Sequence, residues 1–124
     1  MAKLEIDSSR IKYGMTQEMI CGCGSIYVTI NEDDNKDPYE VFVNISKTGS
    51  CTNAITESIG RVISIALQGG AKLDKIFDTL IGIRCPRPTF HTDGRGENVL
   101  SCSDAIAKCI KNYLELKKGS VDYK

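Results

Sequence analysis

The sequence predicts an α+β domain: an antiparallel sheet from the N-terminal half, with three helices from the C-terminal half packed on one face. Up to about residue 45, apolar and polar residues alternate, as in half-buried strands. From about residue 55 onward, apolar residues recur at helical spacing. Strands followed by helices favour a sheet covered on one face. The 124 residues suit one domain, predicted over 1–124 with a core at 14–116 and a flexible tail at 117–124.

The strands are expected to form a hairpin with one further strand beside it. Apolar residues occupy every second position in 26–30 and again in 41–45. Between these segments lies the polar, turn-forming run Asn31–Pro38, which predicts an exposed loop. An earlier strand within 10–20 is expected to pair with the hairpin.

The first long helix is predicted from residues that share one helical face: Ile55, Ile59, Val62, Ile63 and Ala66. Ser50 or Thr52 can cap its start, and Gly69 and Gly70 supply its end.

Two further helices are expected. The shorter one carries apolar residues within 73–80 and ends near Gly82. The last begins after Ser101 or Ser103 and continues to about Lys117.

The charge balance argues against two classes of partner. Sixteen basic and sixteen acidic residues give a formal net charge of zero. Such a chain has no long-range field that draws it to nucleic acid or to an anionic membrane. The N-terminus shows no apolar signal-peptide core, and the most apolar stretch, Ile59–Leu67, is about half the length that spans a bilayer. We therefore expect a cytoplasmic protein.

Six cysteines are the main chemical feature of this chain. In a cytosolic protein this number favours a metal site or redox thiols over disulfides. Cys109 lies on the apolar face of the last helix and is predicted to be a core residue. Four of the other five lie at the ends of predicted elements, where loops can converge; the five are Cys21, Cys23, Cys51, Cys85 and Cys102. A closed zinc site needs four thiolates, but the spacing is not that of a zinc ribbon, so burial as small apolar residues stays open.

Two weaker candidates accompany the cysteines. His91 lies in a loop rich in proline and glycine; it can replace a thiolate as a ligand or simply face solvent. The run Lys47-Thr48-Gly49-Ser50 directly precedes a helix, where backbone N–H groups attract anions. This run also reads as an ordinary capped turn. The basic residues that can join an anion site there are Arg61, Arg84 and Arg87.

Several blocks in order resemble the TSCPD domain, found toward the C-terminus of many adenosylcobalamin-dependent (class II) ribonucleotide reductases and as small free-standing proteins. The blocks are Cys23-Gly24, Tyr27-Val28-Thr29-Ile30-Asn31, Lys47-x-Gly49-x-Cys51, Gly82-Ile83-Arg84-Cys85-Pro86 and Leu100-Ser101-Cys102-Ser103-Asp104-Ala105. The resemblance runs from about Gly14 to Tyr113. The chain departs from the motif at Ser103, where the family has proline.

The resemblance implies a shared metal site, with zinc as the expected metal. The family's recurrent cysteines fall on Cys23, Cys51, Cys85 and Cys102, which leaves Cys21 and Cys109 as extra. It supplies no active site, because the family's reductases do their chemistry in a large α/β barrel for which this chain has no room. We therefore expect a domain that is not catalytic by itself.

Three functions remain open. The first is a zinc-stabilised accessory domain that docks on the catalytic chain of a ribonucleoside-diphosphate reductase-like enzyme of the cobalamin-dependent class. The second is a free-standing protein that binds or senses a nucleotide through the anion site. The third is a thiol-redox protein that uses Cys21 or Cys23. A homodimer or higher oligomer is compatible with each.

Overall fold

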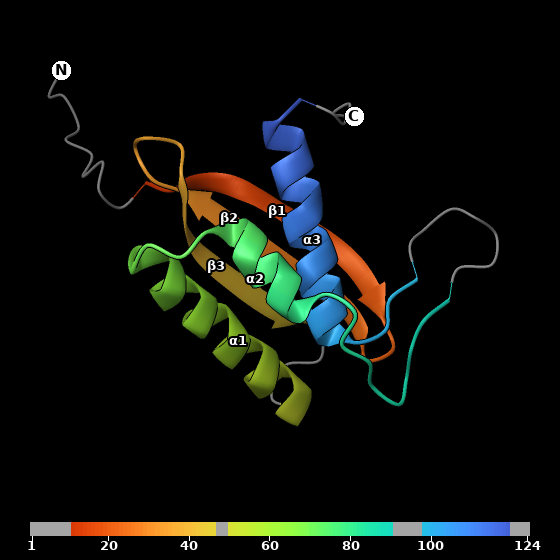
Figure 1. Cartoon of the computed structure of the whole chain (residues 1–124). Helices are drawn as coiled ribbons and strands as arrows, with labels where there is room; N and C mark the ends of the chain where they lie inside the picture. Colours follow the sequence, from red (N-terminus) through yellow and green to blue (C-terminus); the bar gives the residue numbers. More distant parts are fainter. Residues whose placement is uncertain (1–10, 47–49, 91–97, 120–124) are drawn as a thin grey trace, which may run out of the picture.

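The structure is a computed structural model that describes residues 11–46, 50–90 and 98–119. Its elements are β1 (Tyr13–Cys21), β2 (Gly24–Glu32), β3 (Pro38–Ile45), α1 (Cys51–Gln68), α2 (Leu73–Leu80) and α3 (Cys102–Lys117). The strands form one antiparallel sheet in the order β1-β2-β3 (Figure 1). The predicted α+β class is confirmed, although α1 spans the middle of the chain and only α2 and α3 lie fully in its C-terminal half.

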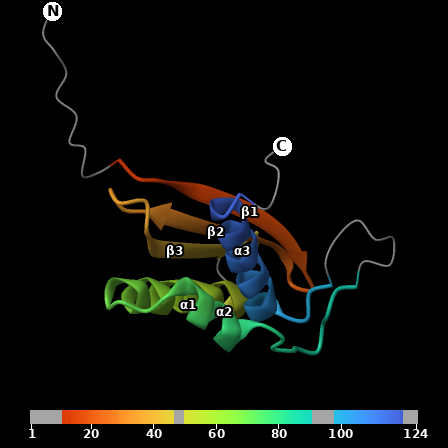
Figure 2. The ribbon, with the colours of Figure 1, turned by 45° about the horizontal axis from the view of Figure 1, so that its top comes forward.

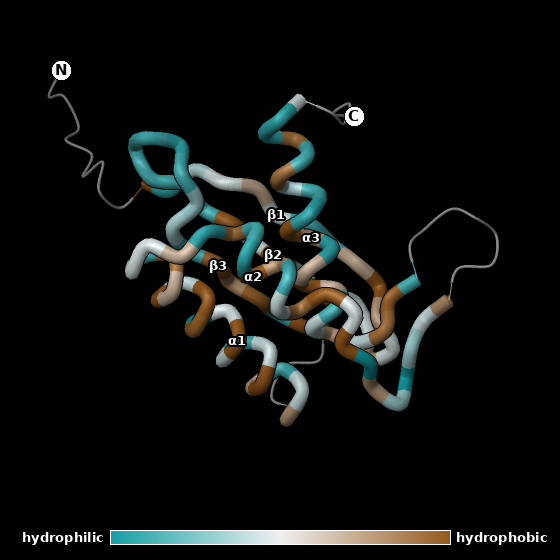
Figure 3. Tube along the Cα trace, in the orientation of Figure 1, coloured by the Kyte–Doolittle hydropathy of each residue, from teal (hydrophilic) through white to brown (hydrophobic). Residues whose placement is uncertain are grey.

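The helices cover one face of the sheet (Figure 2). α1 packs on β3, α3 packs on β1 and β2, and α2 packs on α3. The alternating residues of the predicted hairpin point into this layer and are buried: Ile26, Val28, Ile30, Val41, Val43 and Ile45. The β2–β3 loop is hydrophilic and extends away from the core, as predicted (Figure 3).

α1 lies against β3, which is an edge strand of the sheet. Its buried residues are Thr56, Gly60 and Ile63. A Cβ at Gly60 would lie 3.1 Å from the carbonyl oxygen of Val41, so glycine lets the helix come close to the strand. Ser64 completes the contact, because its Oγ accepts a hydrogen bond from the Val41 N–H and donates one to the Val41 carbonyl. Polar side chains of α1 thus satisfy backbone groups that an edge strand leaves free.

The apolar stripe that predicts α1 mostly faces away from the sheet. Of its members, Ile63 is buried, whereas Ile55 and Val62 are exposed. The periodicity therefore identified the helix correctly but not the face that the sheet covers.

α3 crosses the sheet and forms the centre of the core. Cys109 is fully buried among Ile106, Ile110 and Tyr113, which confirms its predicted place. The Tyr113 hydroxyl donates a hydrogen bond of 2.6 Å to Glu32 on β2.

Glu32 makes the stability of the β2–α3 contact depend on pH. Burial opposes its ionisation, but hydrogen bonds from Lys117 and Tyr113 outweigh burial and hold the pKa of Glu32 below its ordinary value. Because the pKa of Glu32 is lower in the folded state than in the unfolded state, its carboxylate stabilises the folded state fully above the unfolded-state pKa of about 4.3. This stabilisation is lost as the pH falls through the folded-state pKa of Glu32.

We expect the wild-type protein to lose more stability than Glu32→Gln between pH 7 and pH 3, because protonation of Glu32 removes its ion pair with Lys117 and weakens the hydrogen bond from Tyr113. Urea unfolding of both proteins at the two pH values measures this. The glutamine can still accept from Tyr113, so the fold should survive the substitution. Equal pH dependence in the two proteins would contradict the assignment.

Within the described ranges, no helix has the length and apolar character needed to cross a membrane.

Candidate functional site

Cysteines from distant parts of the chain meet where β1 turns into β2. Cys21 ends β1 and is buried, and Cys23 follows in the turn and is half-buried. Cys102 begins α3, and its Sγ lies 3.6 Å from the Sγ of Cys21. β1 and α3, the first and last elements of the fold, thus meet where the sulfur atoms of two free cysteines lie close together.

The segment after α2 brings Cys85 to the same end of the molecule. The Cys85 N–H donates to the carbonyl oxygen of Leu100, two residues before Cys102. Further along, Arg87 passes directly over the β1–β2 turn, since a Cβ at Gly22 would lie 2.0 Å from the Arg87 carbonyl oxygen. The Cys85 Sγ itself accepts from the Arg87 N–H at 3.4 Å. Cys85 is therefore held beside the hairpin that carries Cys21 and Cys23.

Ser101 and Asp104 shape this end of the fold. Ser101 caps α3, because its Oγ accepts from the Asp104 N–H. The Asp104 carboxylate accepts from the N–H of Gly82 at 2.8 Å and of Leu100 at 3.0 Å, and pairs with Lys108 at 2.9 Å. One buried carboxylate thus fastens the segments on both sides of the 85–99 region to the start of α3.

Serine stands at 103 where the family motif has proline, and the cap does not depend on it. The capping hydroxyl belongs to the preceding residue, Ser101.

The contact between Cys21 and Cys102 shifts the pKa values of the two thiols in opposite directions. A hydrogen bond from Cys102 lowers the pKa of Cys21 to about 6, with burial opposing it and backbone N–H groups of the turn helping. The same bond and burial raise the pKa of Cys102. The negative charge of Cys21 and the nearby Cys23 act in the same direction on Cys102. Cys21 therefore loses its proton more readily than Cys102.

The cysteines differ in how well they could hold a metal. Thiolates bound to tetrahedral zinc at about 2.3 Å lie about 3.8 Å apart, close to the 3.6 Å between Cys21 and Cys102. Cys51 is exposed at the first residue of α1. Among the described residues, no three His, Cys, Asp or Glu side chains are already arranged to hold an ion. The ligand set Cys23, Cys51, Cys85 and Cys102 stays a prediction.

The proposed anion site is described only in part. Lys47, Thr48 and Gly49 lie outside the described residues, as does His91. Ser50 caps α1 by accepting from the Asn53 N–H at 3.1 Å, as one of the two predicted caps.

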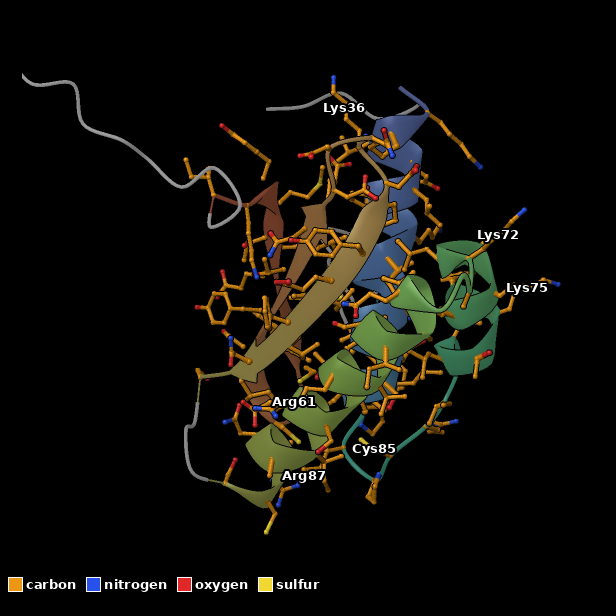
Figure 4. The ribbon with its side chains drawn as sticks, turned by 90° about the vertical axis from the view of Figure 1, so that its left-hand side faces the viewer. Lys36, Arg61, Lys72, Lys75, Cys85 and Arg87 are labelled. Atoms are coloured by element: carbon orange, nitrogen blue, oxygen red, sulfur yellow. The ribbon has the colours of Figure 1, made fainter. Side chains whose placement is uncertain are left out.

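The three arginines of that site are exposed. Arg61 lies 3.9 Å from Glu57, one turn earlier on α1. Figure 4 shows Arg61 and Arg87 toward the same end of the molecule as Cys85, away from Lys36 and Lys72. Arg61 and Arg87 thus lie toward the end of the molecule that holds Cys21, Cys23, Cys85 and Cys102, which we call the cysteine end. Their role in anion binding stays a prediction.

Comparison with known proteins gives one match. The model of the TSCPD domain family matches residues 3–114, most of the chain. No curated protein and no solved structure matches it significantly.

Proposed function

Because the chain belongs to the TSCPD domain family, we propose that it is an accessory domain of ribonucleotide reduction. Zinc stabilises its cysteine end, and it docks on the catalytic chain of a cobalamin-dependent reductase. It performs no catalysis alone. The carrying observation is that Cys21, Cys23 and Cys102 lie together at the β1–β2 turn, while the segment that carries Cys85 packs on the same turn.

The chemistry of this end supports a soft metal. Thiolates are ligands that zinc prefers, and the hydrogen bond with Cys102 already favours the thiolate form of Cys21 against the effect of burial. The Cys23 side chain already lies close enough to Cys102 to raise its pKa, and Cys85 lies on the segment that packs on the same turn. A bound ion would then tie β1, the segment after α2 and α3 together, which is the role of a structural zinc.

Metal analysis of the purified full-length protein tests the proposal. We expect about one zinc per chain, a melting temperature that falls when a chelator is added, and loss of zinc in Cys102→Ser. Cys109→Ala is the matched control, because Cys109 is buried in the core away from this end and should leave the zinc content unchanged. Cys21→Ser and Cys51→Ser then decide which of the two completes the site.

Docking is measured with the same preparations. The zinc-loaded protein should bind the catalytic chain of a class II reductase in a calorimetric titration, and Cys102→Ser should bind it less tightly. A protein that contains no metal and whose melting temperature does not change when a chelator is added would overturn the zinc proposal. If oxidised glutathione instead converts Cys21 and Cys102 to a disulfide and is itself reduced to two thiols, a thiol-exchange function replaces it.

A further inference from the structure

The side of α1 that faces away from the sheet is apolar along its whole length. We call it the outer face of α1 and define it by Cys51, Ala54, Ile55, Ser58, Val62 and Ile65. All six are exposed; Val62 is 66% and Ile65 72% exposed. A helix at a protein surface normally turns charged residues outward. This face carries none, and Figure 3 shows hydrophobic segments on successive turns of α1.

The outer face continues into a groove between α1 and α2. The groove has a volume of about 450 Å³ and is lined on the α1 side by Ile59 and Ala66 and on the α2 side by Ile76 and Leu80. The hydroxyl-bearing residues in its lining are Ser58 and Thr79. Exposed apolar surface that is continuous over two helices marks an interaction site.

We propose that a second copy of this chain covers this surface, with α1 packed antiparallel against α1 of the partner about a two-fold axis. In a two-fold dimer one patch meets itself, so it must be self-complementary. The outer face meets that condition in its spacing, its charge and its size.

The spacing is that of a helix-pairing seam. Cys51, Ile55, Ser58, Val62 and Ile65 follow one another at intervals of four and three residues, the pattern by which two helices interlock. The row contains two small residues, Cys51 and Ser58, among larger ones, and Ala54 lies beside it. The large side chains of one copy can therefore pack over Ser58 and Ala54 of the other.

Charge does not oppose the pairing. The chain has a formal net charge of zero, so two copies meet without overall repulsion. Glu57 and Arg61, the charged residues of α1, form an ion pair with each other beside the outer face. The seam itself brings no like charges together.

The size fits a weak, reversible dimer. The 18-residue α1 is about 27 Å long and the 8-residue α2 about 12 Å long, each about 10 Å wide. Each copy thus contributes on the order of 400 Å², and the two together about 800 Å², which is in the range of weak or transient interfaces. We expect a dimer with a micromolar Kd rather than a permanent one.

Sedimentation and light scattering of the full-length protein at about 100 µM test the proposal, a concentration above a micromolar Kd. The wild-type protein should have twice the 13.6 kDa mass of one chain. Val62→Lys should have the mass of one chain with unchanged far-UV circular dichroism, since Val62 is outside the core. The matched control Tyr13→Lys, at a 74% exposed position on β1, should stay dimeric.

A second measurement does not rely on any variant. If folding is coupled to this dimer, the melting temperature of the wild-type protein should rise with protein concentration, and that of Val62→Lys should not. A wild-type protein that stays monomeric at about 100 µM would overturn the proposal and leave the face to a different protein. A Val62→Lys variant that remains dimeric would overturn it too, because the dimer would then use another surface.

Discussion

Asp104→Ala is expected to lower the free energy of unfolding by about 3–5 kcal/mol, the cost of removing one partner of a buried charge pair. The carboxylate is 1% exposed and holds three donors at once: the N–H groups of Gly82 and Leu100 and the ammonium of Lys108. Alanine leaves all three donors without this acceptor, at a position where the side chain of residue 104 is almost fully buried. Each buried unpaired backbone group alone costs about 1–3 kcal/mol.

This loss is a large part of the total stability of a domain, which is about 5–15 kcal/mol. We therefore expect the melting temperature of Asp104→Ala to fall by more than about 10 °C. Asp78→Ala, at an exposed position of α2, is the control and should change stability by less than about 0.5 kcal/mol. Urea unfolding followed by circular dichroism measures both. Equal stability of the two variants would show that the carboxylate does not fasten these segments.

The sheet and the burial of Cys109 could be predicted because they depend on local periodicity. Residues two apart in a strand share a face, and Cys109 follows Ile106 on the helical face that packs on the sheet. Such patterns are readable from neighbours in the sequence, and the structure confirms them.

The face of α1 that contacts the sheet could not be predicted from its apolar residues. The contact is made by Gly60 and Ser64 as much as by Ile63, because Gly60 lets the helix come close to the edge strand and the Ser64 hydroxyl bonds the Val41 backbone. A stripe of apolar residues shows that something covers a helix, but not that its own sheet does so.

The sulfur pair was missed for a different reason. Cys21 was set apart as an extra cysteine, yet it lies 3.6 Å from Cys102, 81 residues away. Spacing cannot reveal a contact that depends on how β1 and α3 pack. A weaker signal was present, since Met15, Met19 and Cys21 fall on the same side of β1, which predicts that Cys21 points inward.

Gly22→Ala is expected to cost about 2–3 kcal/mol through overpacking, and to disturb the cysteine end more than any other part of the fold. The added Cβ would lie 2.0 Å from the carbonyl oxygen of Arg87 and 2.7 Å from its Cβ. The Arg87 backbone cannot easily move away, because a backbone hydrogen bond from Cys85 to Leu100 holds the chain just before it. Just after it, Thr89 and Val99 exchange two backbone hydrogen bonds.

Gly69→Ala separates this effect from the general consequences of replacing glycine. An added Cβ there meets its nearest atoms at 3.4–3.5 Å, which is ordinary contact, and Gly69 has a φ of −85° that alanine adopts without strain. Its stability should stay within about 0.5 kcal/mol of wild type. Urea unfolding of both variants measures the loss of stability. Their zinc content shows whether the substitution also disturbs the metal-binding cysteines. The close packing of the 85–87 segment on the hairpin would be wrong if Gly22→Ala were as stable as Gly69→Ala. If Gly22→Ala loses stability and zinc together, the contact that places Cys85 beside Cys21 and Cys23 also serves to hold the metal.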